Sequence, residues 1–269
     1  MSQPSVRVLE PRQRRLRTIA VFAPLALAVL ALPFLPSFAQ DPTYHEFADQ
    51  RTAAGIPHVG DVITSFLLTL VGLHGLWVVF LGRRRERAFA DPRERRAYGV
   101  LFAGIALTGL GSAYYHWDPT TTTLFWDRLP MTLIFAPLFS IAVAERIGPD
   151  LGRKLLLPAL AVGVSGVVYW HLTELYGTGD VRVYGLVQFY PMVAVPLMLA
   201  LFPPRYTHAH AFWGLFGAYG IAKMFEIFDA DVLALNGFAS GHNLKHVFAA
   251  LGLWALVGML RKRAPLVDR

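Results

Sequence analysis

The last long apolar run of the chain opens with Ser240-Gly241-His242-Asn243-Leu244-Lys245-His246 and continues to Leu260. Its two histidines are four residues apart, and on a helix this spacing places both imidazole rings on one face, one turn apart. Two such rings can bind one metal ion if another part of the chain supplies a third ligand. The pattern also fits two ordinary polar residues at a helix start, but polar side chains in membrane-length segments are costly and tend to be functional.

The composition predicts a membrane protein. The chain has 269 residues, of which 55% are hydrophobic, and apolar runs of about 20 residues recur, the length that a helix needs to cross a bilayer. Because backbone polar groups in lipid must be satisfied within each segment, the sequence predicts an all-α, polytopic membrane helix bundle. The chain contains no cysteine, so a zinc site would use histidine, aspartate or glutamate.

The chain divides into three predicted parts. Residues 1–39 combine a basic start, an apolar middle and Ser37-Phe38-Ala39, which is typical of a secretory signal, and an uncleaved first helix fits equally well. Residues 40–260 form the predicted seven-helix membrane domain, and residues 261–269 a basic tail. The seven core segments are predicted at 61–81, 98–116, 127–145, 155–172, 184–202, 211–228 and 242–260.

Positive charge predicts how these segments thread the membrane. If residue 1 is cytoplasmic, the segments on that side hold 20 of the 25 Arg and Lys residues, and the opposite segments hold only three. This bias predicts a multi-pass protein of the cell membrane with a cytoplasmic C-terminus. The net charge of +7 raises the possibility of nucleic-acid binding. However, the basic residues lie in short segments between apolar runs, so we expect no nucleic-acid partner.

The predicted threading brings five polar residues to the non-cytoplasmic ends of their helices: Ser112, His116, Asp127, His242 and His246. Three histidines at one depth fit a catalytic zinc site, which has three protein ligands and an open position for water. A hydrogen-bond network that only holds helices together is the alternative.

Chemical roles follow from these residue types. Zinc would lower the pKa of a water molecule and polarise a carbonyl group. We expect Asp127, predicted at the start of its helix where the helix dipole favours a carboxylate, to accept and return a proton. Ser112 could donate a hydrogen bond to a developing oxyanion.

Three motifs together carry a family resemblance. Gly111-Ser112-Ala113-Tyr114-Tyr115-His116, Trp126-Asp127-Arg128-Leu129-Pro130-Met131 and His242-Asn243-Leu244-Lys245-His246 resemble the alkaline ceramidase family. That family belongs to a superfamily of seven-helix membrane hydrolases that includes the adiponectin and progestin receptors. The resemblance implies zinc on the three histidines, with the serine and aspartate assisting. It also implies hydrolysis of a ceramide-like lipid to a fatty acid and a sphingoid base.

The resemblance also raises the question of a calcium site. Eukaryotic alkaline ceramidases have a calcium site in an acidic stretch before the first core helix. Asp41, Glu46 and Asp49 occupy that region here, but their spacing departs from the family pattern, and His58 stands where the family has an acidic ligand. These departures put calcium binding in doubt.

A group of charged residues lies at the end of the predicted segment before the His242–His246 pair. Lys223, Glu226 and Asp229 follow one another at intervals of three residues, which lets successive pairs meet on a helix, and Lys245 could pair with either acid. A structural salt bridge is favoured for this group. Two other functions stay open: a receptor or sensor of the same superfamily with a structural zinc, and a proton-coupled transporter that uses this group as its relay.

Overall fold

The computed structural model describes residues 9–83 and 85–266, and this part of the chain forms helices without a β-strand. The long helices are α1 (Pro11–Ala31), α2 (Val59–Phe80), α3 (Arg95–Trp117), α4 (Thr121–Arg146), α5 (Pro149–Leu175), α6 (Arg182–Leu201), α7 (Ala211–Ile227) and α9 (Gly241–Lys262). The short elements are η1 (Leu32–Phe34), η2 (Pro42–His45), η3 (Pro92–Glu94) and α8 (Asp229–Asn236). Within the described residues, seven helices are long and apolar enough to cross a membrane, namely all the long ones except α7. The predicted all-α membrane bundle is therefore confirmed.

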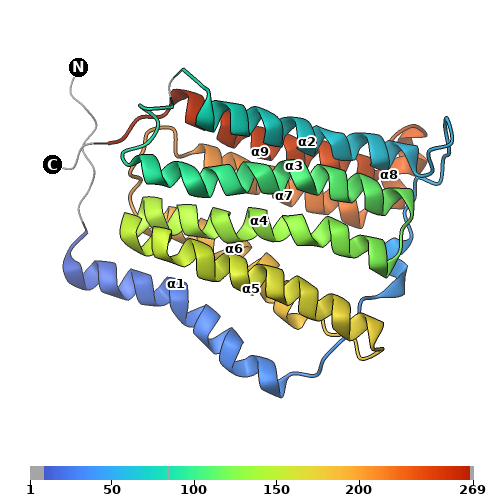
Figure 1. Cartoon of the computed structure of the whole chain (residues 1–269), viewed down its shortest axis with the longest axis horizontal. Helices are drawn as coiled ribbons and strands as arrows, with labels where there is room; N and C mark the ends of the chain where they lie inside the picture. The colour runs from blue at the N-terminus through green and yellow to red at the C-terminus, as the bar shows by residue number, and fades with distance from the viewer. Residues whose placement is uncertain (1–8, 84, 267–269) are drawn as a thin grey trace.

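The long helices lie side by side along one axis (Figure 1). The loops α2–α3, α4–α5 and α6–α7 lie at one end of the bundle, together with the start of α1 and the end of α9. This end carries the basic segments, and we call it the basic end. The opposite end carries the end of α3 and the start of α9, hence the three histidines, and we call it the histidine end.

Small residues allow the helices of the core to pack closely. A Cβ atom added to Gly72 of α2 would overlap the backbone of Ala106 in α3. Leu101, Phe102 and Ile105 of α3 are completely buried in the resulting core. Such contacts are typical of membrane helices, whose association depends on close packing rather than on exclusion of water.

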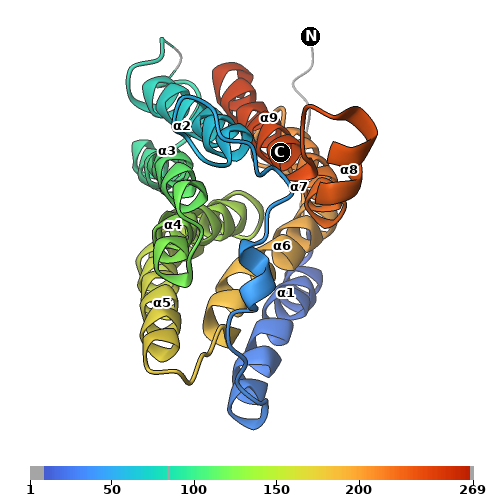
Figure 2. The ribbon, with the colours of Figure 1, turned by 90° about the vertical axis from the view of Figure 1, so that its right-hand side faces the viewer.

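The extra N-terminal helix packs on the outside of the bundle. Figure 2 shows α1 beside α6, where the Tyr190 hydroxyl donates a hydrogen bond of 2.8 Å to the carbonyl oxygen of Val21. The chain then crosses the histidine end before it enters α2. The division at residue 39, and cleavage there, stay predictions.

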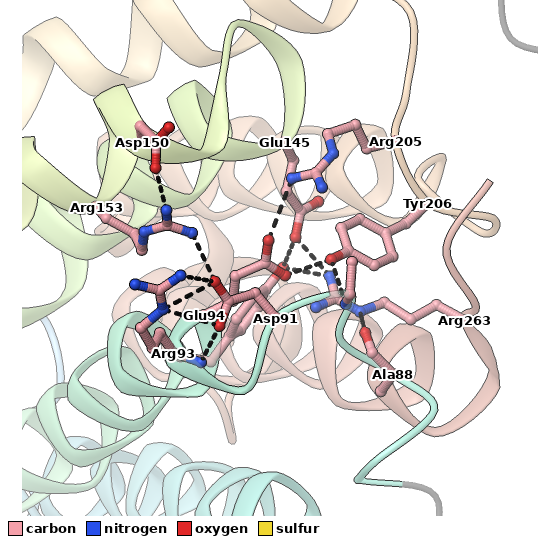
Figure 3. Close-up of polar contacts among 12 residues, drawn as sticks. Ala88, Asp91, Arg93, Glu94, Glu145, Asp150, Arg153, Arg205, Tyr206 and Arg263 are labelled. Carbon is pink, nitrogen blue, oxygen red and sulfur yellow. Dashed lines mark hydrogen bonds and ion pairs between the residues drawn. The ribbon is translucent and has the colours of Figure 1, made fainter. Parts of the chain in front are cut away.

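A buried ion pair fastens the end of α9 to the bundle at the basic end (Figure 3). The Arg263 guanidinium donates to Glu145 at 2.6 Å, to the Tyr98 hydroxyl at 2.8 Å and to the carbonyl oxygen of Ala88 at 2.8 Å. Arg263 is 3% exposed and Glu145 is 5% exposed. This network joins α3, α4 and the chain after α9.

Two predicted helix starts are six residues too late: α4 begins at Thr121 rather than at 127, and α5 at Pro149 rather than at 155. Helix α4 begins at Thr121, because the side chains of Thr120 and Thr123 form a capping box that satisfies free backbone N–H groups. Asp127 therefore lies nearly two turns inside the helix. The expectation that the helix dipole favours its carboxylate does not hold, since that effect is confined to the first turn.

Helix α7 is the shortest of the predicted core segments. It has 17 residues, one fewer than the predicted segment 211–228, and lies at the lower end of the range of about 17–25 residues for a bilayer crossing. It ends at Ile227, and the chain turns into α8 at Asp229. The Asp229 carboxylate accepts hydrogen bonds from the backbone N–H groups of Ala48 and His242, at 2.9 and 2.7 Å, which holds the turn in place.

Candidate metal centre

The structure brings His116, His242 and His246 together in a buried group. Each of the three is less than 7% exposed, and one ring nitrogen from each lies within 4.8 Å of the others. His116 comes from the end of α3, and the other two come from the first turns of α9. Ser240 and Asn243 form a capping box that starts α9 in the register that points both rings inward. The predicted juxtaposition of the three histidines is therefore confirmed.

The free ring nitrogens fit a bound metal ion. Nδ1 of His246 lies 2.9 Å from the Thr64 hydroxyl, which leaves Nε2 for a ligand. Nδ1 of His116 is buried and has no hydrogen-bond partner among the described residues. An unpartnered buried nitrogen is costly, and a metal ion would satisfy it. Imidazole is a ligand for zinc, copper, iron and nickel, so a metal ion is supported and its identity is not shown.

An aromatic side chain closes the outer side of the histidine group. The Phe47 ring lies 4.5 Å from the His116 ring and 4.7 Å from the His242 ring, measured between centroids. The loop that carries it is held by His45, whose ring nitrogens lie 2.8 Å from the Tyr115 hydroxyl and 3.1 Å from the Thr121 hydroxyl. Burial, together with the charge of Arg128, lowers the pKa of His45. A neutral His45 then bridges α3 and α4 at physiological pH.

A cavity of about 160 Å³ adjoins the three histidines inside the bundle. Its wall beyond the histidines is largely apolar and includes Leu68, Met131, Ile134, Met192, Leu215 and Leu253. Ser112 and Asp127 also line it. Gly111 lets α3 and α4 approach so closely that a Cβ there would overlap the carbonyl oxygen of Trp126, which brings these two side chains to one side of the cavity.

The charged group of Lys223 and Glu226 borders the same cavity. Nζ of Lys245 lies 2.6 Å from Glu226 Oε1 and 3.5 Å from His242 Nε2, and Lys223 contacts the other oxygen of Glu226. The predicted salt bridge is confirmed for Lys223 and Glu226, and Lys245 joins it. Asp229 does not, because it binds backbone N–H groups instead. Lys245 lies beside His242 because residues three positions apart on a helix are neighbours.

The acidic residues named for calcium each have another partner or face solvent. The Asp41 carboxylate accepts a hydrogen bond of 2.9 Å from the backbone N–H of Thr43, and Glu46 is exposed. Burial opposes ionisation of Asp49, but hydrogen bonds from Arg51 at 2.7 Å outweigh it and hold the pKa of Asp49 below its usual range. Calcium binding stays untested.

Sequence reasoning missed two residues of the site. Thr64 was hidden because a threonine in an apolar helix commonly bonds its own backbone, and Thr64 does this with Gly60 as well as contacting His246. Phe47 lies in a polar loop with no periodic pattern, so its position depends on tertiary contacts alone.

Comparisons with known proteins do not identify a family. No protein-family model matches the sequence, and no curated protein is significantly similar to it. The resemblance to the alkaline ceramidases therefore stays a prediction from the motif residues.

Proposed function

We propose that this chain is a zinc-dependent membrane hydrolase that cleaves the amide bond of ceramide-like N-acyl lipids. One observation carries the proposal: three buried imidazoles converge at a cavity inside a membrane bundle. Such a site combines a metal ligand set with an environment suited to a lipid. The motif resemblance described above supports the same reaction class.

The three histidines would hold the zinc ion. When bound, zinc supplies a Lewis acid that polarises the amide carbonyl and lowers the pKa of a water molecule. Three protein ligands leave one position open, as in catalytic rather than structural zinc sites. The adjoining cavity provides space at that position, which favours a hydrolase over a receptor with a closed, structural zinc.

Asp127 and Ser112 would carry the remaining steps. Hydrolysis adds water across the C–N bond: the hydroxyl group joins the acyl carbon, and a proton joins the amine nitrogen. Asp127 would accept the proton of the water and return it to the leaving amine. Ser112 would donate a hydrogen bond to the carbonyl oxygen as negative charge develops there. Both residues line the cavity, where these two roles require them.

The cavity is small for a whole lipid. Pockets for small ligands generally measure about 300–1,000 Å³, and this one measures about 160 Å³. It could hold the amide group and the first carbon atoms on either side. The rest of the hydrocarbon would lie in the membrane around the helices.

Mass spectrometry of a lipid mixture tests the proposal. Purified protein should convert N-acyl lipids to fatty acid and free amine, and a zinc chelator should abolish the conversion. Metal-dependent ligand binding without turnover would favour the receptor. Uptake into proteoliposomes without lipid turnover would favour the transporter, although the proposed relay is broken at Asp229, which binds backbone N–H groups.

A further inference from the structure

Two lysines share one carboxylate on the wall of the cavity. Glu226 contacts Lys223 through one oxygen and Lys245 through the other. All three side chains line the cavity, at 36%, 18% and 23% exposure for Lys223, Glu226 and Lys245. One carboxylate between two ammonium groups leaves a local excess of one positive charge.

The sum of the formal charges on the cavity wall also indicates an excess of positive charge. The described charged residues on its wall are Lys223, Lys245, Glu226 and Asp127, whose charges cancel. A divalent ion held by three neutral imidazoles would therefore leave a net charge of +2. Proton transfer between water and Asp127 would not change this sum, because the proton stays in the cavity. Asp229, which accepts a hydrogen bond from the backbone N–H of His242 and lies outside this wall, offsets part of the charge. A carboxylate on the bound lipid would offset more of it beside the lysine pair, whereas a neutral lipid such as a ceramide would not.

We propose that the site takes N-acyl lipids whose amine part carries a carboxylate close to the amide, such as N-acyl amino acids. This inference rests on the proposed hydrolase function and changes its preferred substrate from a neutral, ceramide-like lipid to an acidic N-acyl lipid. Lys245 lies 3.5 Å from His242 and contacts Glu226, which in turn contacts Lys223. A carboxylate a few bonds from an amide at the histidines would therefore meet the lysine pair.

Lys223 is the residue that tests this specificity. It contacts none of the three histidines, whereas Lys245 lies beside one of them. Substituting Lys223 by Gln removes one positive charge and keeps the Lys245–Glu226 pair. Lys223→Arg keeps the charge and serves as the conservative variant. Lys154→Gln, an exposed lysine on α5 at the basic end, is the matched control.

The experiment compares N-palmitoylglycine with N-palmitoylethanolamine, which differ mainly in a carboxylate against a hydroxyl. Palmitate release by zinc-loaded protein should favour N-palmitoylglycine. Lys223→Gln should lower kcat/KM for this substrate about tenfold or more, mainly through KM, as for a lost hydrogen bond to a charged group. Turnover of the ethanolamide should fall by a much smaller factor in Lys223→Gln, both activities of Lys154→Gln should stay unchanged, and Lys223→Arg should restore the preference.

Binding of the two lipids, measured on the same preparations by competition with a fluorescent fatty acid, separates this inference from the proposed hydrolase. Equal turnover of both lipids, or an equal loss for both in Lys223→Gln, would overturn the inference and leave the hydrolase standing. If neither of these lipids nor a ceramide is hydrolysed, the hydrolase fails. In that case, tighter binding of N-palmitoylglycine that depends on Lys223 would still support the anion subsite, and equal binding would reject it.

Discussion

The Thr64 hydroxyl oxygen lies 2.9 Å from Nδ1 of His246, and it also lies 2.7 Å from the carbonyl oxygen of Gly60. A hydroxyl has one proton, and the carbonyl can only accept it, so the threonine oxygen accepts the N–H of the imidazole. The proton of His246 is thereby held on Nδ1, and the lone pair of Nε2 faces the other two histidines. Thr64 thus fixes both the tautomer and the orientation of a metal ligand.

Replacing Thr64 should weaken metal binding without unfolding the protein. Thr64→Val keeps the shape of the side chain and removes the acceptor, and the zinc affinity should fall about 10- to 100-fold, the usual effect of losing such a partner. Thr64→Ser should bind zinc almost as tightly as the wild type. Competition with a chromophoric zinc chelator measures the affinity, and an unchanged affinity in Thr64→Val would show that the contact does not orient the ring.

Substitutions of Asp127 and Ser112 should lower turnover without loss of the metal. Asp127→Asn keeps the size of the side chain but cannot accept a proton, so turnover should fall about a hundredfold or more while zinc is retained. Ser112→Ala should also retain zinc and lose roughly 10²–10³ in turnover. Zinc content and palmitate release are measured on the same preparations. Wild-type turnover in Asp127→Asn would remove this residue from the mechanism, and loss of zinc would make it a ligand.

The histidine group could be predicted from the sequence because its geometry follows from local rules. The spacing of His242 and His246 places their rings on one helical face, and the charge bias places His116 at the same end of the bundle. Hydrophobic length alone located the long helices. These features depend on residues close together in the chain, or on the membrane, which sets the helix length and the side on which each helix end lies.

Features that depend on contacts between distant segments could not be predicted. Thr120 and Thr123 extend α4 through a polar stretch that resembles a loop, which moved Asp127 away from the helix start. The Asp229 carboxylate accepts a hydrogen bond from the backbone N–H of Ala48, in a loop distant in the sequence, and does not join the predicted salt bridge. Phe47 reaches the histidines only because that loop crosses the histidine end of the bundle.

The ion pair at the basic end should dominate local stability. Glu145→Gln leaves the Arg263 guanidinium buried without its counter-charge, and breaking such a pair costs about 3–5 kcal/mol. Asp150→Asn is the control, because the Arg153–Asp150 pair has a largely exposed acid and is worth about 1 kcal/mol or less. Unfolding in detergent should show a large loss for the first variant and little change for the second. Equal stability of both would contradict the importance of the buried pair.

Cysteine labelling tests the orientation of the bundle. The chain contains no cysteine, so single cysteines can be placed at Ala90 and Thr178, which are exposed. Ala90 belongs to the α2–α3 loop and Thr178 to the α5–α6 loop, and these loops lie at the basic end and the histidine end. The charge bias predicts that Ala90→Cys reacts with an impermeant reagent only from the cytoplasmic side and Thr178→Cys only from the opposite side. Labelling of both positions from one side would rule out this threading.

Zinc content and amide hydrolysis, measured together on one set of variants, test the central claim most directly. The wild type should contain one zinc ion per chain and release palmitate from an N-palmitoyl lipid. The doubly substituted His242→Ala/His246→Ala protein should lose both the metal and the activity. His210→Ala, altered at the basic end, should keep both. Full zinc occupancy with unchanged hydrolysis in the doubly substituted protein would contradict the account.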